Sequence, residues 1–263
     1  MTQLLSLICI SLLLSSSAVV ASLNTLPRLE FEIVKRWPSD PELFTQGLVL
    51  NKGQLYQSGG GYNRSSLVTR TPQQANARIS RKLPRRWFAE GITVCNDELF
   101  LLTWRRQIAA VYEPETLTET RRLRYRGQGW GLTCHQDELL MSNGTATLYW
   151  RNSNDFRVLR SVEVKANGKP LTNLNELEWI NGYIYANIWQ TSSIAQIDPK
   201  TGNVRAIIVL DNLLSPKQSK NAGVLNGIAW DPERQLLLVT GKHWPILFGL
   251  KLPAIADSGT STP

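Results

Sequence analysis

A short pattern of polar and apolar positions occurs five times along the chain. In each copy, a polar or aromatic residue is followed by glycine and then by leucine or isoleucine, which opens an apolar strand; the fourth copy has glutamate instead of glycine. Because one unit of this kind does not bury its apolar face alone, the repetition predicts a single domain. The glycine positions lie about 45 residues apart, a period typical of a repeated supersecondary unit: Gly47, Gly91, Gly131, Glu176 and Gly227.

Each repeat is predicted to contain four strands. In the second copy, the glycine strand is followed by the turn residues Asn96-Asp97, by an apolar strand over 98–104 and by two more strands before the next copy. The last repeat ends one strand short, whereas residues 29–36 form a spare strand near the N-terminus. We therefore expect an all-β, five-bladed β-propeller whose ring is closed by an N-terminal strand, because closure protects the sheet edges. No helix is required.

The two ends of the chain differ in composition from the repeats. Residues 4–14 form an apolar run of signal-peptide length, and Val19-Val20-Ala21 fits a cleavage site. We expect a signal peptide over 1–21, a propeller over 22–253, a disordered tail over 254–263 and a secreted or periplasmic location. Because Lys and Arg are lacking before the apolar run, an uncleaved anchor is the alternative. Residues 213–224 are expected to form a loop over the channel.

The net charge is +8, and much of the excess lies in residues 81–86 and 121–126. One interpretation is an anionic partner such as a nucleic acid. The other is that arginine lines the exposed face of outer strands. We favour the second and expect no nucleic-acid partner, because the sequence has no recognition helix and no long basic tract.

The cysteines leave two alternatives open. Cys9 lies in the expected signal peptide, which leaves Cys95 and Cys134 as an even pair in an oxidising compartment. The two residues lie on opposite faces of their strands, and neighbouring blades meet through opposite faces. A disulfide and two buried free thiols are both compatible with this placement.

The positions just before the four glycines and Glu176 are the main candidates for chemistry. In a propeller, the first strand of each blade lines the central channel, so these residues are expected to form a ring at its mouth. The ends of the second strands add Trp104, Trp189 and Lys242. A pocket of this composition suits a small, neutral, amide-bearing group better than a phosphate or a metal ion. The ring consists of Gln46, Glu90, Trp130, Asn175 and Asn226.

The remaining aromatic residues and the histidines are interpreted as structural. Trp150, Trp179 and Trp230 are assigned to packing. His135 and His243 are the only histidines, too few for a three-ligand zinc site without added carboxylates. We therefore predict no essential metal and no cofactor.

These motifs identify a resemblance to the glutaminyl-peptide cyclotransferases of the plant and bacterial type, over residues 31–252. The chain departs from the family pattern at Gln57 and Gly59, where Glu and Thr are usual, and at Ala89, where Gly is common; the departures concern the first blade's loop and substrate preference. The motifs are Phe44-Thr45-Gln46-Gly47-Leu48, Glu90-Gly91-Ile92-Thr93, Leu102-Thr103-Trp104, Gly129-Trp130-Gly131-Leu132-Thr133, Leu174-Asn175-Glu176-Leu177-Glu178-Trp179, Ala186-Asn187-Ile188-Trp189, Leu225-Asn226-Gly227-Ile228-Ala229, and Val239-Thr240-Gly241-Lys242 with Trp244-Pro245.

The resemblance implies conversion of an N-terminal glutaminyl residue to pyroglutamyl with loss of ammonia. Glu90 is the expected acid and base, because its carboxyl would be partly desolvated by indoles. Glu178 is assigned to orienting a neighbour or holding the substrate amine. The partners would be peptides or proteins with N-terminal Gln, bound by a monomer that contacts no membrane after signal cleavage. Trp104, Trp130 and Trp189 would enclose the substrate, and Gln46, Asn175, Asn226 and Lys242 are candidate donors to the oxyanion.

Two rival hypotheses belong to other functional classes. One is a non-enzymatic propeller that captures peptide N-termini or another small ligand. The other is a metal-dependent lactonase, which needs several channel carboxylates or amides around a calcium ion. The ring before the glycines offers only one carboxylate, Glu90, so the lactonase ranks low.

Overall fold

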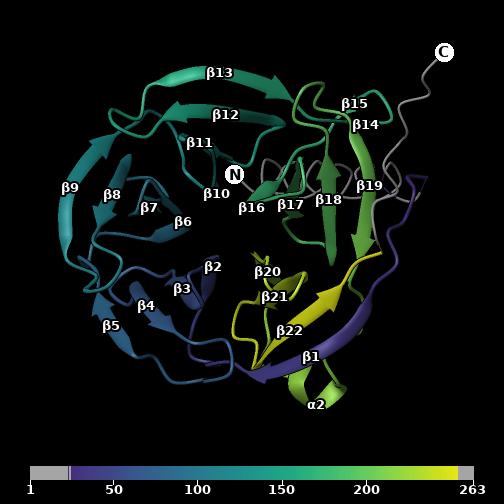
Figure 1. The fold of residues 1–263 in the computed structure, drawn as a ribbon, viewed down its shortest axis with the longest axis horizontal. Helices are drawn as coiled ribbons and strands as arrows, with labels where there is room; N and C mark the ends of the chain where they lie inside the picture. Colours follow the sequence, from purple (N-terminus) through teal and green to yellow (C-terminus); the bar gives the residue numbers. More distant parts are fainter. Residues whose placement is uncertain (1–22, 24, 254–263) are drawn as a thin grey trace, which may run out of the picture.

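The computed structural model describes residues 23 and 25–253, which form a ring of four-stranded antiparallel sheets around a central axis (Figure 1). There are five such sheets, so the described residues confirm the predicted five-bladed β-propeller. Within each blade the first strand is innermost, and the following strands step outward in sequence order.

The strand bounds are as follows. Blade 1 contains β2 (Thr45–Asn51), β3 (Gln54–Gly59), β4 (Ser66–Arg70) and β5 (Ile79–Lys82), and blade 2 contains β6 (Ala89–Cys95), β7 (Glu98–Thr103), β8 (Ile108–Tyr112) and β9 (Glu119–Arg124). Blade 3 contains β10 (Leu132–His135), β11 (Glu138–Met141), β12 (Thr147–Asn152) and β13 (Val158–Glu163), and blade 4 contains β16 (Leu174–Ile180), β17 (Tyr183–Ile188), β18 (Ser193–Ile197) and β19 (Val204–Val209). Blade 5 contains β20 (Leu225–Asp231), β21 (Leu236–Gly241) and β22 (Ile246–Lys251).

The N-terminal strand closes the ring, as predicted. Strand β1 (Glu32–Pro38) pairs antiparallel with β22 as the outermost strand of blade 5, with Glu32 opposite Lys251 and Pro38 opposite Ile246. The strand starts later than the predicted range of 29–36. The residues before it lie against blade 4, where the backbone N–H of Leu29 donates to the carbonyl of Ile207 at 2.8 Å. Pairing β1 with β22 joins the N-terminal part of the chain to the last blade.

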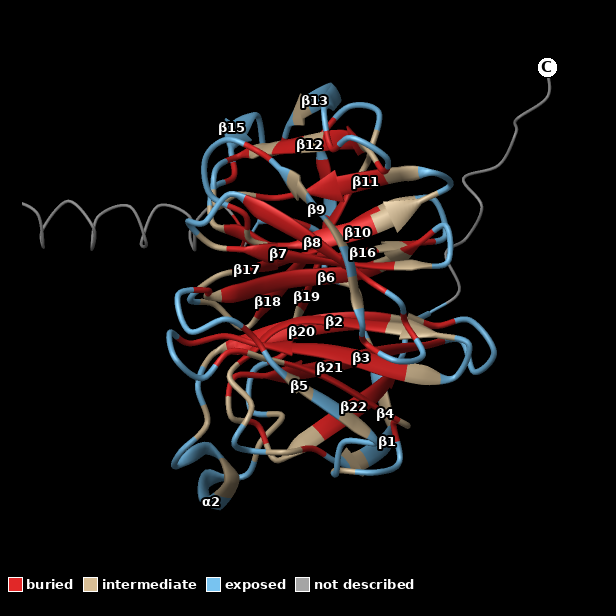
Figure 2. Ribbon diagram, turned by 90° about the vertical axis from the view of Figure 1, so that its left-hand side faces the viewer, coloured by how far each residue is buried: buried red, intermediate tan, exposed pale blue. Residues whose placement is uncertain are grey.

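Burial follows the position of each strand within its blade. The inner three strands are largely buried, whereas the outer strands of blades 1, 2, 3 and 5 are mostly exposed or half-buried (Figure 2). The outer strand of blade 4, β19, is mostly buried. Strand β9 alternates half-buried and exposed residues, and its exposed face carries Arg122 and Arg124. For β9, the interpretation that arginine lines the exposed face of an outer strand is thus confirmed. Trp150 is buried in the core, and Trp179 and Trp230 pack against the core, as the sequence predicted.

Two small elements were not predicted. Residues 213–224 contain a short helix, α2 (Pro216–Ser219), which starts at Ser215 with a capping box: the Ser215 hydroxyl accepts from the Gln218 N–H, and the Gln218 side chain accepts from the Ser215 N–H. The helix lies at the periphery beside β1 rather than over the channel, which corrects the expected placement of this connection (Figure 1). The second element is a two-residue hairpin of β14 (Lys165–Ala166) and β15 (Lys169–Pro170).

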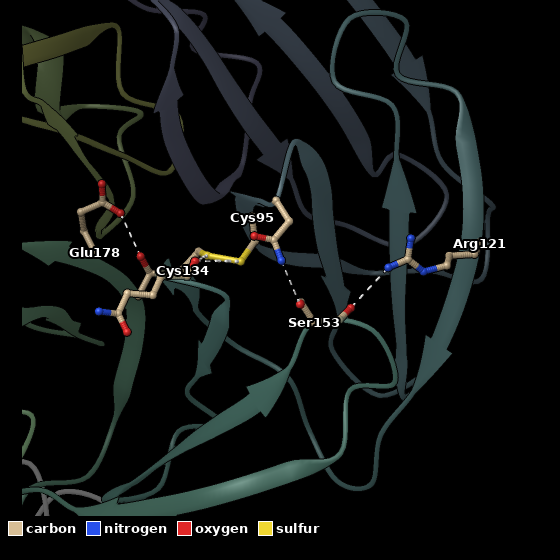
Figure 3. The surroundings of a disulfide bond; sticks show 8 residues. Cys95, Arg121, Cys134, Ser153 and Glu178 are labelled. Atoms are coloured by element: carbon tan, nitrogen blue, oxygen red, sulfur yellow. Dashed lines mark hydrogen bonds between the residues drawn. A yellow bond between two sulfur atoms is a disulfide. The ribbon is translucent and has the colours of Figure 1, made fainter.

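The structure resolves the cysteine alternatives in favour of a disulfide between Cys95 and Cys134 (Figure 3). Cys95 ends β6 and Cys134 lies in β10, so the bond links the inner strands of blades 2 and 3. Nearby, Ser153 joins the same two blades, because its hydroxyl accepts from Asn96 and its carbonyl accepts from Arg121. The covalent bond and these hydrogen bonds fix the two blades at the turn end of their inner strands.

The predictions for the signal peptide, its cleavage site, Cys9 and the C-terminal tail lie outside the described residues. Within residues 23 and 25–253, no helix is long and apolar enough to cross a membrane.

Candidate active site

The ring residues before the glycines are presented by irregularities in the inner strands. The antiparallel register between the first and second strand shifts between Thr45 and Gly47, and again between Ala89 and Ile92. The same shift occurs in β16 between Leu174 and Leu177 and in β20 between Leu225 and Ile228. A β-bulge bends its strand and re-aims a side chain, and bulges are over-represented next to active sites. The shift thus occurs in four of the five blades, and in blades 1, 2 and 4 it accompanies a ring residue that lines the channel mouth.

The glycines allow the inner strands to approach one another closely. A Cβ atom on Gly91 would lie 2.5 Å from the Leu132 nitrogen, and one on Gly131 would lie 2.0 Å from the Asn175 carbonyl oxygen. Both atoms belong to the backbone of the next blade, so a side chain at either position would force the blades apart. The Gly91 N–H donates to the Trp130 carbonyl at 2.5 Å across this contact. The glycine in the repeat is therefore required by packing around the channel.

A cavity of about 270 Å³ opens at this end of the channel. It brings together seven of the nine predicted site residues, from all five blades and from strands far apart in the sequence. Two further residues, which the sequence analysis did not single out, complete its wall. The lining consists of Gln46, Glu90, Trp104, Trp130, Asn175, Trp189 and Lys242, with Phe44 and Phe88.

Glu90 is the acid of this cavity and is only 5% exposed. Its Oε2 accepts a hydrogen bond from Gln46 Nε2 at 2.7 Å, and no described residue donates to its Oε1. Burial raises the pKa of Glu90 well above its usual range, and the charge of Lys242 and the Gln46 hydrogen bond oppose that rise. The Glu90 backbone is held by blade 1, because its carbonyl accepts from the Ser58 hydroxyl. Glu90 is therefore a fixed carboxyl with a free oxygen and an elevated pKa.

Lys242 supplies the positive charge. It follows β21 and is 7% exposed, and its Nζ lies 4.6 Å from the centre of the Phe44 ring. Burial lowers the pKa of Lys242, while the charge of Glu90 raises it in part. The ammonium and the carboxyl stabilise each other's charged forms across the cavity, although no ion pair within 4.0 Å joins them among the described residues.

Two amide oxygens in the cavity have no partner. Gln46 Oε1 and Asn175 Oδ1 are buried and take no hydrogen bond from any residue of 23 and 25–253. Leaving a buried acceptor unsatisfied costs about 1–3 kcal/mol. Gln46 and Asn175 line the cavity together with Glu90, so a ligand that donates N–H groups would match the acceptors of this lining.

The indole walls are held by a residue that the sequence analysis missed. Gln128 Oε1 accepts from Trp104 Nε1 at 2.7 Å and from Trp130 Nε1 at 3.0 Å. Trp130 also packs edge-on against Trp189, with ring centres 5.5 Å apart. One side-chain carbonyl thus fixes two walls of the cavity, which come from blades 2 and 3.

Phe44, Phe88 and Gln128 share a position in the repeat from which the sequence would have identified them. Phe44 and Phe88 come two residues before Gln46 and Glu90, and Gln128 comes two residues before Trp130. Because strand side chains alternate with a period of two, a residue at this spacing points to the same side as the ring residue. The position two before the ring therefore supplies a second layer of the cavity.

Two predicted substrate-binding residues do not line the cavity. Asn226 is fully buried, and its Nδ2 donates to the carbonyls of Thr45 and Gln46 at 3.1 Å each. Glu178 accepts from the Trp230 N–H at 2.9 Å and from the Thr133 hydroxyl at 3.2 Å, a contact visible in Figure 3. Both side chains join neighbouring blades inside the channel, so the bulge at β20 aims Asn226 at blade 1 instead of at the cavity.

No group of three His, Cys, Asp or Glu residues able to hold a metal ion is found in the part of the chain that the structure describes. His135 stacks on Trp179 with ring centres 3.8 Å apart, and burial lowers its pKa. His243 lies behind the cavity wall, packed on Phe44 with ring centres 5.4 Å apart. The prediction that neither histidine is catalytic remains a prediction.

Comparison with known proteins agrees with this geometry. The sequence matches the glutamine cyclotransferase family over residues 4–252. It is 37% identical over 236 residues to a glutaminyl-peptide cyclotransferase of Arabidopsis thaliana, and the match covers 88% of this chain and 74% of that relative. The crystal structure of glutaminyl cyclase from Myxococcus xanthus is similar with a TM-score of 0.78 at 32% identity, covering 88% of this chain and 100% of that one. The resemblance predicted from the sequence motifs is confirmed, and the chain belongs to the glutamine cyclotransferase family.

Proposed function

We propose that this protein is a glutaminyl-peptide cyclotransferase, which converts the N-terminal glutaminyl residue of a peptide or protein to pyroglutamyl and releases ammonia. Family membership supports the reaction class. The observation that carries the mechanism is the Glu90 carboxyl, which is buried in a cavity beside two amide oxygens without partners. A glutaminyl N-terminus offers the matching groups, an amine and a carboxamide, both of which donate N–H hydrogen bonds.

The cavity assists the reaction first by folding the substrate. The α-amine attacks the γ-carboxamide carbon of the same residue, so both reacting groups arrive on one molecule. Holding them in a near-attack geometry removes part of the entropic barrier. Trp104, Trp130 and Trp189 would enclose the folded side chain, and Gln46 Oε1 and Asn175 Oδ1 would accept from its N–H groups.

Glu90 would perform two proton transfers in sequence. In the first, its ionised form takes a proton from the attacking amine as the new C–N bond forms. In the second, it returns that proton to the departing nitrogen as the old C–N bond breaks and ammonia leaves. A raised pKa favours such a shuttle, because it makes the ionised carboxyl a stronger base for the amine proton.

Lys242 would stabilise the oxyanion of the tetrahedral intermediate. Its ammonium is buried in the same cavity as Glu90, and charge stabilisation is stronger in a water-excluded site. Gln46 contributes differently from the sequence prediction, because its amide donates to Glu90 and thereby fixes the carboxyl. We assign the acid–base step to Glu90 and no step to a metal ion.

The test is incubation with a Gln-initiated peptide, followed by mass spectrometry for a product lighter by one ammonia. An N-acetylated copy of the peptide is the control, because its blocked amine does not attack. A parallel reaction with a strong chelator tests metal independence, and full loss of turnover that zinc or calcium restores would contradict it. If the peptide binds but stays unchanged in mass, the protein is the non-enzymatic binder instead.

Export is a separate proposal, based on the apolar run at 4–14 and the small residues that follow. N-terminal sequencing of the mature protein tests it, with Ser22 as the expected first residue. A mature protein that begins at or near Met1 would contradict it.

A further inference from the structure

A second hollow lies beside the active-site cavity, between blades 2 and 3. It has a volume of about 470 Å³, and its lining includes the end of β9 and residues of β12 and β13. Figure 1 shows these strands in adjoining blades. We call it the arginine cleft, because four of its eleven lining residues are arginines: Arg124, Arg126, Arg151 and Arg157.

Gln128 connects the arginine cleft to the cavity. It lines the cleft, and its side-chain carbonyl binds the indoles of Trp104 and Trp130, which line the cavity. Asn143 also lines the cleft, one residue before Gly144, against which the Trp130 ring packs. A peptide whose first residue occupies the cavity therefore has the cleft directly beyond the Trp130 wall.

The positive charge of the cleft is largely unneutralised. Arg124 and Arg126 are exposed, and neither makes an ion pair or a side-chain hydrogen bond with a residue of 25–253. Arg151 is 7% exposed; it donates to the Phe156 carbonyl at 2.8 Å, and its buried Nε has no hydrogen-bond partner. Only Arg157 is paired, with Asp155 at 3.2 Å, and Asp155 is the one carboxylate in the lining.

The two arginines at the start of β9 behave differently. Arg121 binds Glu98 through both ends of its guanidinium, and Arg122 binds Glu119 in the same way. Their charge is neutralised within blade 2. The unpaired arginines of this strand and the loop after it are thus the ones that face the cleft beside the active site.

We propose that the arginine cleft is a substrate subsite that binds a carboxylate in the peptide segment after the N-terminal glutamine. This proposal rests on the proposed cyclotransferase function, because it assigns the rest of the peptide a place once the first residue is in the cavity. Guanidinium groups match carboxylates as paired donors, and the cleft holds three without a carboxylate partner. The enzyme then prefers peptides with Asp or Glu shortly after the glutamine.

The expected preference for acidic over neutral peptides is moderate. An exposed pair between arginine and a carboxylate contributes modestly and weakens with salt. Two such contacts correspond to about a 3- to 10-fold higher kcat/KM for an acidic peptide over its amide counterpart at low salt. An extended chain advances about 3.3 Å per residue, so positions two to four after the glutamine are the ones to vary.

The experiment measures kcat/KM for Gln-initiated peptides that carry a single Glu at the second, third or fourth position after the glutamine. Each is compared with a peptide that carries Gln at the same position. The test variant is Arg124→Gln/Arg126→Gln. The matched control is Lys200→Gln/Arg205→Gln, which removes the same charge from exposed positions in blade 4. We expect the wild type and the control to favour one acidic position, and the test variant to lose that preference while it turns over neutral peptides normally.

The outcomes separate the two proposals. Normal turnover of neutral peptides with no acidic preference overturns the subsite but leaves the cyclotransferase intact. An acidic preference that survives in the test variant, or that falls equally in the control, also overturns the subsite. If no peptide is turned over, the same comparison is made on the Kd of fluorescent peptides. An acidic preference in Kd that the test variant alone loses supports the subsite, and its absence overturns it.

Discussion

Two glutamates of the channel, Glu90 and Glu176, are both buried but differ in the hydrogen bonds that their carboxyls accept. Glu90 lies at the mouth and Glu176 lies in the channel interior, and burial raises the pKa of both carboxyls well above the usual range. Both oxygens of Glu176 accept from backbone N–H groups, from Leu48 at 3.1 Å and from Ile228 at 2.9 Å. Glu90 accepts one side-chain hydrogen bond, and its other oxygen faces the cavity.

This difference separates a structural carboxyl from a reactive one. Glu176 belongs to blade 4 and its donors belong to blades 1 and 5, so it ties three blades together across the axis. Asn226 and Glu178 belong to the same interior layer, because they too bind groups of other blades. At the mouth, acceptor oxygens on Gln46 and Asn175 remain without partners. Asn226 Oδ1 in the interior also has no partner, so the contrast rests on the carboxyls: both oxygens of Glu176 are satisfied, whereas one oxygen of Glu90 has no donor among the described residues.

The largest expected effect is the loss of kcat when Glu90, at the channel mouth, is replaced. Glu90→Gln retains the size and hydrogen-bonding capacity of the side chain but removes the ionisable group. We expect kcat to fall by about 10² to 10⁴, the usual contribution of general acid–base catalysis, with an unchanged melting temperature. Because burial raises the Glu90 pKa, the acidic limb of the pH–rate profile should change as well.

Measuring kcat and melting temperature on one preparation provides the control for Glu90→Gln. A folded variant with near wild-type kcat would remove Glu90 from the mechanism and direct attention to Lys242. A loss of stability with normal turnover by the folded molecules would mean that Glu90 behaves like Glu176.

The next largest expected effect is a lower free energy of unfolding when Glu176, in the channel interior, is replaced. Glu176→Ala removes the acceptor for the Leu48 and Ile228 N–H groups, and an unsatisfied buried donor costs about 1–3 kcal/mol. We expect the free energy of unfolding to fall by roughly 2–5 kcal/mol in urea denaturation. Glu176→Gln is the matched control, because it keeps one oxygen acceptor and should lose less. Equal stability of Glu176→Ala and the wild type would show that the interior layer does not hold the blades together.

A smaller effect is expected from the second layer of the mouth. Gln128→Leu removes the carbonyl that fixes Trp104 and Trp130, and we expect about a tenfold lower kcat/KM toward a neutral Gln-peptide, since each hydrogen bond contributes about 1 kcal/mol. Gln128 is exposed, so the melting temperature should be unchanged. Gln128→Glu keeps an acceptor for both indoles and should restore most of the activity. Failure of Gln128→Glu to recover activity, or full activity in Gln128→Leu, would contradict a positioning role.

Periodicity made most of the fold predictable, because each blade repeats the same strand pattern and the chain ends supplied the missing strand. The site was predicted where the repeat itself carries it, as at Glu90 and Trp130. Asn226 and Glu178 were predicted to bind substrate and lie outside the cavity, because alternation gives the side of a strand but not the depth along the channel. Gln128 was missed because the spacing of two residues before Trp130 indicates only the side that it faces, whereas its role depends on two indoles from different blades.

The smallest expected effect concerns the pH dependence of stability in the interior. Burial raises the pKa of Glu178 to about 8, above the 4.5 of a free glutamate. The folded protein therefore binds a proton that the unfolded chain has lost in this range, so stability falls as pH rises from about 5 to about 8. Glu178→Gln has no proton to lose, and its melting temperature should decline less across that range, by at least about 2–4 °C, the shift that about 1 kcal/mol produces in a protein of this size. Glu163→Gln, at an exposed position of β13, is the control and should follow the wild type. If Glu178→Gln shows the wild-type pH dependence, Glu178 is ionised in the folded protein at neutral pH, and its burial is compensated by Trp230 and Thr133.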